Sequence, residues 1–412
     1  MINIHIAIID ADLIGRPKHR FPNLACMKIS GYYKNQNYNV KLITNYKNLF
    51  SQYIELHQDN KPDFNFILYD DTTKKKYVRY YREEDIIFDK IIISKVFTDT
   101  PILLQIKHLD ICEYGGTGFF YDKAEPLPDH IEHYKPDYRL YDDWVNQKIK
   151  EGDKPLNYKY YTDYSIGFTT RGCFRKCEFC VNKNYNKVEL RSPIEEFLDQ
   201  DSKYICLLDD NVLGFSKWDL ILESLQETNK RFEFKQGMDV RLMTDKKAET
   251  LSSSKYIGDY IFAFDDIADR DLIEKKLQLW KRYCTKTTKL YVFCGYDRNN
   301  KWDYDFWIQD IKDTFERVKI LMKYGCLPYI MRYDKYKESP YYGMYVNIAS
   351  WGNQPNFFKK KSFKEWCITD DKRKGGNSAT IKYLNLFEEK YPEISKKYFD
   401  MKFDDLNKYK YK

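Results

Sequence analysis

The chain from residue 164 onward alternates between short apolar segments and amphipathic segments, and this alternation restricts the folds that it can adopt. Six segments have the composition of buried strands: 164–169, 204–209, 232–237, 260–264, 289–294 and 327–332. The segments between them have apolar residues three to four positions apart, which is typical of helices packed on a sheet. Strands that alternate with helices pair in parallel through right-handed crossovers. The pattern predicts an α/β fold for residues 164–333.

Three cysteines follow the first of these predicted strands at CxxxCxxC spacing. They are Cys173, Cys177 and Cys180, at the end of the segment Gly-Phe-Thr-Thr-Arg-Gly-Cys-Phe-Arg-Lys-Cys-Glu-Phe-Cys. Cysteine thiolates are the usual ligands of iron–sulfur clusters, and four of them normally hold a 4Fe–4S cluster. Three thiolates would leave one iron open to a further ligand. The spacing therefore indicates a 4Fe–4S cluster with an open coordination position.

A zinc site and unligated core cysteines are the alternatives to a cluster. Structural zinc sites combine one CxxC pair with a second pair of cysteines or histidines. No second pair follows here, because all six histidines precede Cys173 and the later cysteines stand alone. Free cysteines are often buried in protein cores, so a coincidence of three unligated cysteines stays open as an alternative.

The cysteine spacing, together with Phe179 just before the last cysteine, resembles the cluster loop of the radical S-adenosylmethionine (SAM) superfamily. In that superfamily the open iron binds the amino and carboxylate groups of SAM. An electron from the cluster cleaves SAM to methionine and a 5′-deoxyadenosyl radical, which abstracts hydrogen from a substrate. The resemblance implies a partial (β/α)6 barrel over residues 164–333, a metal site on Cys173, Cys177 and Cys180, and an electron donor such as flavodoxin or ferredoxin. It also implies that Phe179 lies near the adenine of SAM.

The same resemblance places SAM across the carboxyl ends of the strands, where sites form in parallel αβ folds. Our candidates for binding SAM there are Asp210, Gln236, Arg241 and Asp265. A carboxylate suits the ribose hydroxyls or the ammonium group of SAM, and an arginine suits its carboxylate. Helix capping and surface ion pairing are the alternative roles of such residues. Cys294, at the carboxyl end of another predicted strand, is a candidate hydrogen donor to a product radical.

Residues 1–122 have the pattern of a small Rossmann-like domain with a parallel sheet. Its glycine-rich end, Glu-Tyr-Gly-Gly-Thr-Gly-Phe-Phe, resembles the close of the cobalamin-binding-type domain that precedes many radical SAM barrels. The cobalamin signature of that domain is DxHxxG, and here Asp12 stands at the histidine position of Asp-Ala-Asp-Leu-Ile-Gly, with His19 at the wrong spacing. We therefore expect a degenerate domain without cobalamin, and binding without a histidine ligand is the alternative.

The remaining segments predict a linker and a helical tail. Residues 123–163 are punctuated by proline and predict a linker with a short helix, and residues 334–412 predict a mostly helical C-terminal extension. No apolar run reaches the ~18–20 residues of a membrane span, and the N-terminus lacks the features of a signal peptide. With ten cysteines and no export signal, we expect a cytoplasmic protein with reduced thiols.

Three functions fit these observations. The first is a radical SAM enzyme that acts on an unidentified small-molecule or macromolecular substrate. The second is an RNA- or tRNA-modifying radical SAM enzyme, since a net charge of +7 permits a nucleic-acid partner. The third is a cluster-bearing electron-transfer or binding protein that no longer cleaves SAM. The cluster loop is common to radical chemistry on peptides, sugars, lipids and nucleotides, so it does not select the substrate.

Overall fold

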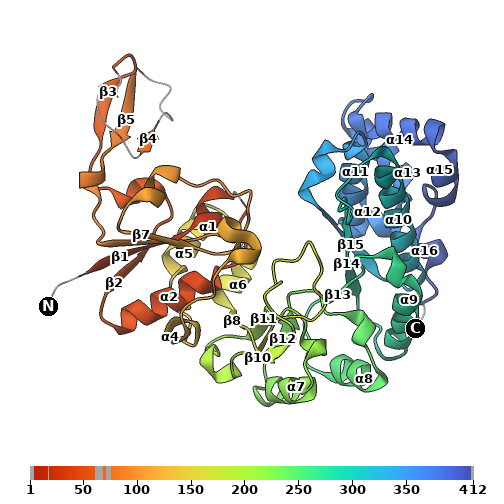
Figure 1. Cartoon of the computed structure of the whole chain (residues 1–412), viewed down its shortest axis with the longest axis horizontal. Helices are drawn as coiled ribbons and strands as arrows, with labels where there is room; N and C mark the ends of the chain where they lie inside the picture. The colour runs from red at the N-terminus through yellow and green to blue at the C-terminus, as the bar shows by residue number, and fades with distance from the viewer. Residues whose placement is uncertain (1–3, 17, 61–67, 71–75, 410–412) are drawn as a thin grey trace. The chain divides into compact units, whose positions relative to one another are not determined.

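The structure is a computed structural model, and it describes residues 4–16, 18–60, 68–70 and 76–409 (Figure 1). The chain divides into two compact units, and the chain passes between them several times. The first unit comprises Met1–Gly167, Cys180–Asn184 and Ser192–Ile205, and the second comprises Phe168–Phe179, Tyr185–Arg191 and Cys206–Lys412. In the described part of the chain, no helix is both long enough and apolar enough to cross a membrane.

The first unit is built on a four-stranded sheet with the strand order β2-β1-β6-β7. Its strands are β1 (His5–Asp10), β2 (Asn39–Leu42), β6 (Lys90–Ser94) and β7 (Cys112–Gly115). All neighbouring strands pair in parallel, and Asp10 lies opposite Ser94 where β1 and β6 end. The parallel sheet predicted for residues 1–122 is therefore confirmed. Sheets of this order bind ligands where strand order reverses, which here is between β1 and β6.

Apolar side chains cover both faces of this sheet, because successive residues of a buried strand point to opposite sides. Ile6 and Ile8 of β1 pack with helix α2 (Leu24–Asn35), and Ala7 and Ile9 pack on the other face with Ile91 of β6. Figure 1 shows α2 and the short helix α4 (Asp129–Glu132) along the sheet. The remaining helices of this unit are α1 (Ala11–Gly15), α3 (Thr117–Phe120), α5 (Asp142–Lys150) and α6 (Lys159–Thr162).

Residues 123–163, which we predicted as a linker, pack into the core of the first unit. Tyr141, Val145 and Tyr158 are buried there beside Ile8 and Met27. A separate antiparallel sheet has the order β3-β5-β4, with β3 (Ile54–His57), β4 (Leu68–Asp70) and β5 (Tyr77–Tyr81). It extends from the edge of the first unit in Figure 1.

Two buried aspartates organise the carboxyl edge of the four-stranded sheet. Asp10 caps α1 by accepting from the amides of Asp12 and Leu13 at 3.1 and 3.2 Å, and it accepts from the Tyr141 hydroxyl at 2.9 Å. Asp12 accepts from the amide of Val96 at 2.6 Å and from the Thr100 hydroxyl. Asp12, at the histidine position of the cobalamin signature, thus holds the loop that follows β6.

All six strands that we predicted after residue 163 are present. They are β8 (Tyr164–Gly167), β11 (Tyr204–Leu207), β12 (Arg231–Phe234), β13 (Tyr260–Ala263), β14 (Thr288–Cys294) and β15 (Leu327–Arg332). β8 and the start of β11 belong to the first unit, where the Tyr204 amide donates to the Asp163 carbonyl just before β8. The end of β11 and β12 belong to the second unit, where the Lys235 amide donates to the Leu207 carbonyl.

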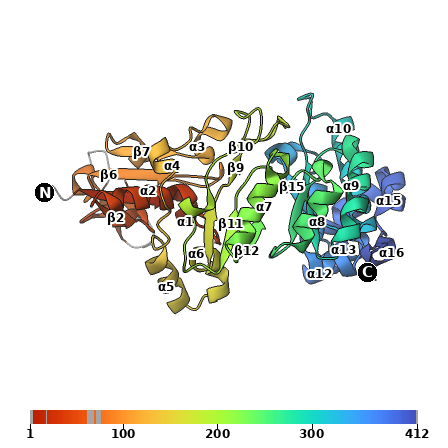
Figure 2. The ribbon, with the colours of Figure 1, turned by 90° about the horizontal axis from the view of Figure 1, so that it is seen from below.

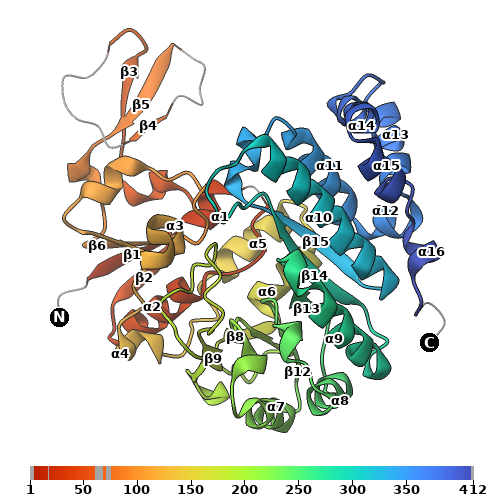
Figure 3. The ribbon, with the colours of Figure 1, turned by 45° about the vertical axis from the view of Figure 1, so that its right-hand side comes forward.

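β13, β14 and β15 form a parallel three-stranded sheet in that order. The helices after β11 are α7 (Trp218–Glu227), α8 (Asp245–Ser253), α9 (Arg270–Tyr283) and α10 (Tyr304–Lys323). Figure 3 shows α10 and α11 (Tyr342–Gly352) beside β14 and β15. Figure 2 gives the view from below, in which α8, α9 and α10 are labelled. The α/β fold with parallel sheets is confirmed, and closure into a partial barrel stays a prediction.

The C-terminal extension is helical, as predicted. After α11 the helices are α12 (Pro355–Lys360), α13 (Phe363–Arg373), α14 (Ala379–Lys390), α15 (Pro392–Tyr398) and α16 (Phe403–Leu406). A capping box begins α13, because the Ser362 hydroxyl accepts from the Glu365 amide and the Glu365 carboxylate accepts from the Ser362 amide. Phe315 of α10 packs against Phe363, Tyr398 and Phe399, which joins the extension to the helix that covers β14.

The first prediction concerns Asp10, which titrates differently in the folded and unfolded chain. Burial raises the pKa of Asp10 from 3.8 to about 7, against the opposing effect of the Tyr141 hydroxyl. The folded state therefore keeps a proton that the unfolded state loses, and stability falls as pH rises from about 4 to about 7. Asp10→Asn should remove this fall, which is about 4 kcal/mol at most. Urea unfolding at pH 5 and pH 8 measures it.

Asp99→Asn is the matched control, because the Asp99 side chain is 74% exposed. This variant should keep the pH dependence of the unsubstituted protein. If the unfolding free energies of Asp10→Asn and Asp99→Asn change equally between the two pH values, Asp10 does not bind the proton.

Candidate functional site

The cysteine loop is closed at its base by a short pair of antiparallel strands. β9 (Thr170–Arg171) pairs with β10 (Glu189–Leu190), so that Arg171 lies opposite Glu189. The buried carboxylate of Asp209 holds the entry to β9, because it accepts from the amides of Thr169 and Thr170 at 3.0 and 2.6 Å and from both of their hydroxyls. Burial raises the pKa of Asp209, and these hydrogen bonds oppose the rise.

Gly172 makes the turn that leads into the first cysteine. Its φ of +92° lies in the region that glycine adopts freely, and a Cβ at this position would lie 2.5 Å from the Lys187 carbonyl oxygen. The Gly172 amide donates to the carboxylate of Asp210 at 2.7 Å. Asp210, which we predicted to bind SAM, therefore fixes the backbone at the entry to the loop.

The loop thiols accept hydrogen bonds from nearby N–H groups. The Cys173 sulfur accepts from the Arg175 amide and the Asn211 side chain, both at 3.5 Å, and the Cys180 sulfur accepts from the Asn182 amide at 3.4 Å. N–H donors favour the charged form of a thiol and are found around cluster sulfurs. The three loop cysteines are half-buried, whereas six of the other seven are buried. This donor set fits an iron–sulfur cluster.

The three thiols are divided between the two units. Cys173 and Cys177 belong to the second unit and Cys180 belongs to the first, and the placement of the units relative to one another is not determined. Across residues 4–409, apart from the gaps given above, no group of three or more cysteine, histidine or carboxylate side chains forms a metal site. The cysteine trio therefore stays a prediction.

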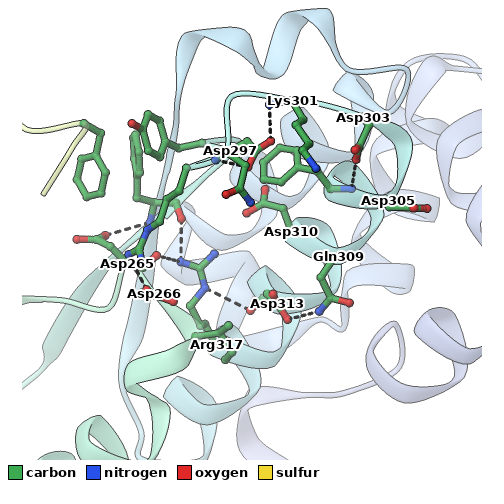
Figure 4. Close-up of a pocket in the computed structure, with 17 residues that line it drawn as sticks. Asp265, Asp266, Asp297, Lys301, Asp303, Asp305, Gln309, Asp310, Asp313 and Arg317 are labelled. Carbon is green, nitrogen blue, oxygen red and sulfur yellow. Dashed lines mark hydrogen bonds and ion pairs between the residues drawn. The ribbon is translucent and has the colours of Figure 1, made fainter.

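A cavity of about 610 Å³ lies at the carboxyl ends of β13 and β14 (Figure 4). Phe179 of the cysteine loop lines it, and its ring centroid lies 4.2 Å from that of Phe293 and 5.8 Å from that of Tyr296. The Tyr296 hydroxyl donates to Glu178 at 3.1 Å, which ties the loop after β14 to the cysteine loop. The aromatic residue of the predicted cluster motif thus reaches a cavity of ligand size.

Asp265 also lines this cavity, as expected for a residue at the end of a parallel strand. It accepts from the Phe293 amide at 3.2 Å. Burial raises the pKa of Asp265 to about 6, and the positive charge of Arg317 opposes the rise. The carboxyl therefore titrates closer to neutral pH than that of an exposed aspartate.

The cavity is strongly acidic, and several of its aspartates hold the surrounding backbone by hydrogen bonds. Asp297 accepts from three amides of the loop after β14, and Asp310 accepts from the Gly295 amide at 2.7 Å and from the Tyr345 hydroxyl at 2.8 Å. The lining contains seven aspartates against three basic residues, Arg298, Lys301 and Arg317. This excess of carboxylates favours a cationic ligand.

Arg317 is the basic residue at the floor of the cavity, and sequence analysis missed it. Its side chain, 2% exposed, donates to the carbonyls of Asp265 and Phe293 at 2.8 Å and of Phe264 at 3.3 Å (Figure 4). It thereby joins the carboxyl ends of β13 and β14. The available signal was an arginine on the apolar face of α10, next to Val318.

Three other residues that we predicted to bind SAM do not line the cavity: Asp210, Gln236 and Arg241. Arg241 pairs with Asp239 at 2.7 Å and with Asp269 at 2.5 Å, and Arg175 of the cysteine loop pairs with the same Asp239 at 2.6 Å. Gln236 is exposed after β12. Asp239 is therefore the residue that joins the cysteine loop to the end of β12, and our candidate set omitted it.

Cys294, the candidate hydrogen donor, is buried at the end of β14. Its thiol donates to the Met331 carbonyl at 3.4 Å, and burial raises its pKa. Its neighbours in sequence, Phe293 and Tyr296, line the cavity and Cys294 does not. A role as hydrogen donor stays a prediction.

No protein-family model matches the chain, and no curated protein matches its sequence. Similar solved structures include the cobalamin-dependent S-adenosylmethionine radical enzyme OxsB with aqua-cobalamin and S-adenosylmethionine bound, with a TM-score of 0.34, and the same enzyme with aqua-cobalamin bound, with a TM-score of 0.35. Both are 12% identical to this chain, and each match covers 99% of it and 58% of OxsB. The chain thus spans less than two thirds of OxsB. An identity of 12% and TM-scores below 0.5 do not support an argument about function, so we argue function from the residues of this chain.

The second prediction tests the role of Arg317 in building the cavity. Arg317→Met keeps an unbranched side chain but leaves three buried carbonyls without this donor. An unsatisfied buried group costs roughly 1–3 kcal/mol, so the free energy of unfolding should fall by about 3 kcal/mol or more. Chemical denaturation measures the loss.

Arg298→Met is the matched control, because Arg298 lines the same cavity but is 65% exposed and pairs with Asp266. An exposed ion pair contributes at most about 1 kcal/mol. Equal losses in the two variants would contradict a special role for Arg317.

Proposed function

We propose that this protein is a radical SAM enzyme with a partial (β/α)6 barrel over residues 164–333. Cys173, Cys177 and Cys180 would hold a 4Fe–4S cluster, and SAM would bind in the acidic cavity. The observation that carries the proposal is the position of Phe179. It belongs to the cysteine motif and also lines a cavity of ligand size at the carboxyl ends of two parallel strands.

The chain prepares the cysteine loop for a charged group. When bound, the cluster would supply the electron that cleaves SAM to methionine and a 5′-deoxyadenosyl radical. The Arg175 amide and the Asn211 side chain donate to the Cys173 sulfur, as N–H groups do around the sulfurs of iron–sulfur clusters. Asp209 and Asp210 hold the backbone before Cys173, so that the loop is ordered before a ligand binds.

The cavity lining suits each part of SAM. The rings of Phe179, Phe293 and Tyr296 offer apolar faces on which adenine can stack. Asp265 and Asp266 can accept from the ribose hydroxyls, and the negative lining favours the sulfonium and ammonium charges of SAM. Arg241 is already paired with two carboxylates, so it acts on the site by holding Asp239.

The test of the proposed function is anaerobic reconstitution with iron and sulfide. About four iron and four sulfide per chain are expected for a 4Fe–4S cluster, and the reduced protein should produce 5′-deoxyadenosine from SAM. Cys173→Ala, Cys177→Ala and Cys180→Ala should each lose the cluster. Cys112→Ala is the matched control and should keep it, because Cys112 is half-buried but lies outside the loop.

The outcomes separate the proposal from its alternatives. An iron-replete protein that makes no 5′-deoxyadenosine would instead be an electron-transfer or binding protein. Zinc bound by the same three cysteines, with no iron retained, would contradict the cluster itself.

The binding of SAM gives the next prediction. Phe179→Ala removes a stacking face worth roughly 1–3 kcal/mol, so the Kd for SAM should rise about 5- to 150-fold. Asp265→Asn should also weaken binding, because it removes a negative charge from the cavity. Equilibrium dialysis of SAM against each variant measures both effects. Asp271→Asn, whose side chain is 90% exposed, is the control and should bind normally.

The pH dependence of SAM binding follows from the raised pKa of Asp265. Below its pKa of about 6 the carboxyl is protonated and no longer attracts a cation. The affinity for SAM should therefore fall as pH decreases from 7.5 to 5.5, and Asp265→Asn should flatten this dependence. An equally steep fall in the variant would assign the titration to another group.

A further inference from the structure

A second cavity, of about 320 Å³, lies at the opposite edge of the β13-β14-β15 sheet. Residues that precede β14 and begin β15 line it, whereas the acidic cavity lies where β13 and β14 end. The end of α9 and the segment after α16 complete the wall. In parallel αβ folds the catalytic residues lie at carboxyl ends, so this cavity is separate from the proposed catalytic site.

The lining of this cavity is basic. Lys281, Lys286 and Lys359 reach it from three different elements, and Asp404 is its one carboxylate. Neutral hydrogen-bonding side chains complete it, from Thr285, Thr287 and Asn407. The charge is therefore opposite to that of the first cavity, and it favours an anion.

Lys281 is the residue that most clearly indicates a ligand. It lies in the last turn of α9, its exposure is only 6%, and it lines the cavity. Among the residues that the structure describes, the Lys281 amino group has no hydrogen-bond acceptor and no carboxylate within ion-pair distance. Lys286, by contrast, donates to the Tyr256 carbonyl at 3.2 Å. The side chain of Lys281 is therefore largely buried at the cavity, while its amino group is left for a ligand to pair with.

The C-terminal end of α9 offers partial compensation for Lys281. A helix C-terminus favours a nearby cation. This effect does not account for three lysines around one cavity, nor for a largely buried lysine that has no ion-pair partner. An anion in the cavity would pair with Lys281 directly.

We propose that this cavity binds a small anion that carries a phosphate group. Lys281 would be the central contact, Lys286 and Lys359 would approach from the rim, and the Thr285 and Thr287 hydroxyls would donate to the remaining oxygens. Lysine binds phosphate as a point charge from any direction, which fits a lining that draws its lysines from different segments of the chain. The volume is that of a small ligand. This site is independent of the proposed SAM chemistry.

The experiment measures thermal unfolding of the full chain in inorganic phosphate against chloride of equal ionic strength. A ligand that binds only the folded state raises Tm, and a rise of roughly 1–3 °C is expected for a chain of 412 residues. Lys281→Met removes the central amino group while keeping an unbranched side chain of similar length, and it should lose most of the rise. Lys275→Met, an exposed lysine on the same helix, is the matched control and should keep it.

Comparison of the two variants also removes the general stabilisation that phosphate gives to any protein. An equal rise in the unsubstituted chain, Lys281→Met and Lys275→Met would place phosphate elsewhere and overturn the proposal. No rise in the unsubstituted chain would also overturn it and would leave Lys281 as a partner of the α9 C-terminus. If Lys281→Met does not fold, Lys359→Met takes its place and should lose part of the rise, and a full rise in that variant overturns the proposal.

Discussion

The contact on which the candidate site most depends is the one between Arg317 and the backbone carbonyls at the ends of β13 and β14. Parallel strands leave their last carbonyls without strand partners, and in a buried edge such groups need donors. One guanidinium supplies them to Phe264, Asp265 and Phe293. The side chains that follow these carbonyls then leave the sheet in fixed directions. Asp265 faces the cavity for this reason, and the ring of Phe293 is held for contact with Phe179.

Buried aspartates hold the backbone after other strands. They accept hydrogen bonds from backbone amides, whereas Arg317 donates hydrogen bonds to backbone carbonyls. Asp209 accepts from two successive amides before the cysteine loop, and Asp12 accepts from the loop after β6. In a medium of low dielectric constant, such charge-assisted bonds are strong, and an unmade bond costs more than in water. The same arrangement therefore occurs in both units. An aspartate that follows one strand accepts hydrogen bonds from the backbone that follows a neighbouring strand.

Sequence patterns predicted the strands well, because buried parallel strands are continuous apolar runs whatever their neighbours are. The same reasoning predicted a helical C-terminal extension but did not locate α11 within it, because apolar residues cover most of the surface of α11 and leave no stripe. The roles of the candidate site residues stay predictions. Phe179 and Asp265 line the cavity, whereas Arg241 is paired with Asp239, which strand position alone could not reveal. Arg317 and Lys281 were missed because their roles depend on contacts between segments far apart in sequence.

The path of the chain between the two units has a consequence for dissecting the protein. The first unit takes 180–184 and 192–205 from beyond its main segment, and the second takes 168–179 and 185–191 from before its own. A single proteolytic cut therefore yields no fragment that contains one unit complete and nothing of the other. Any attempt to study either half alone must splice its separate segments together, because truncation removes some of the segments that each unit needs.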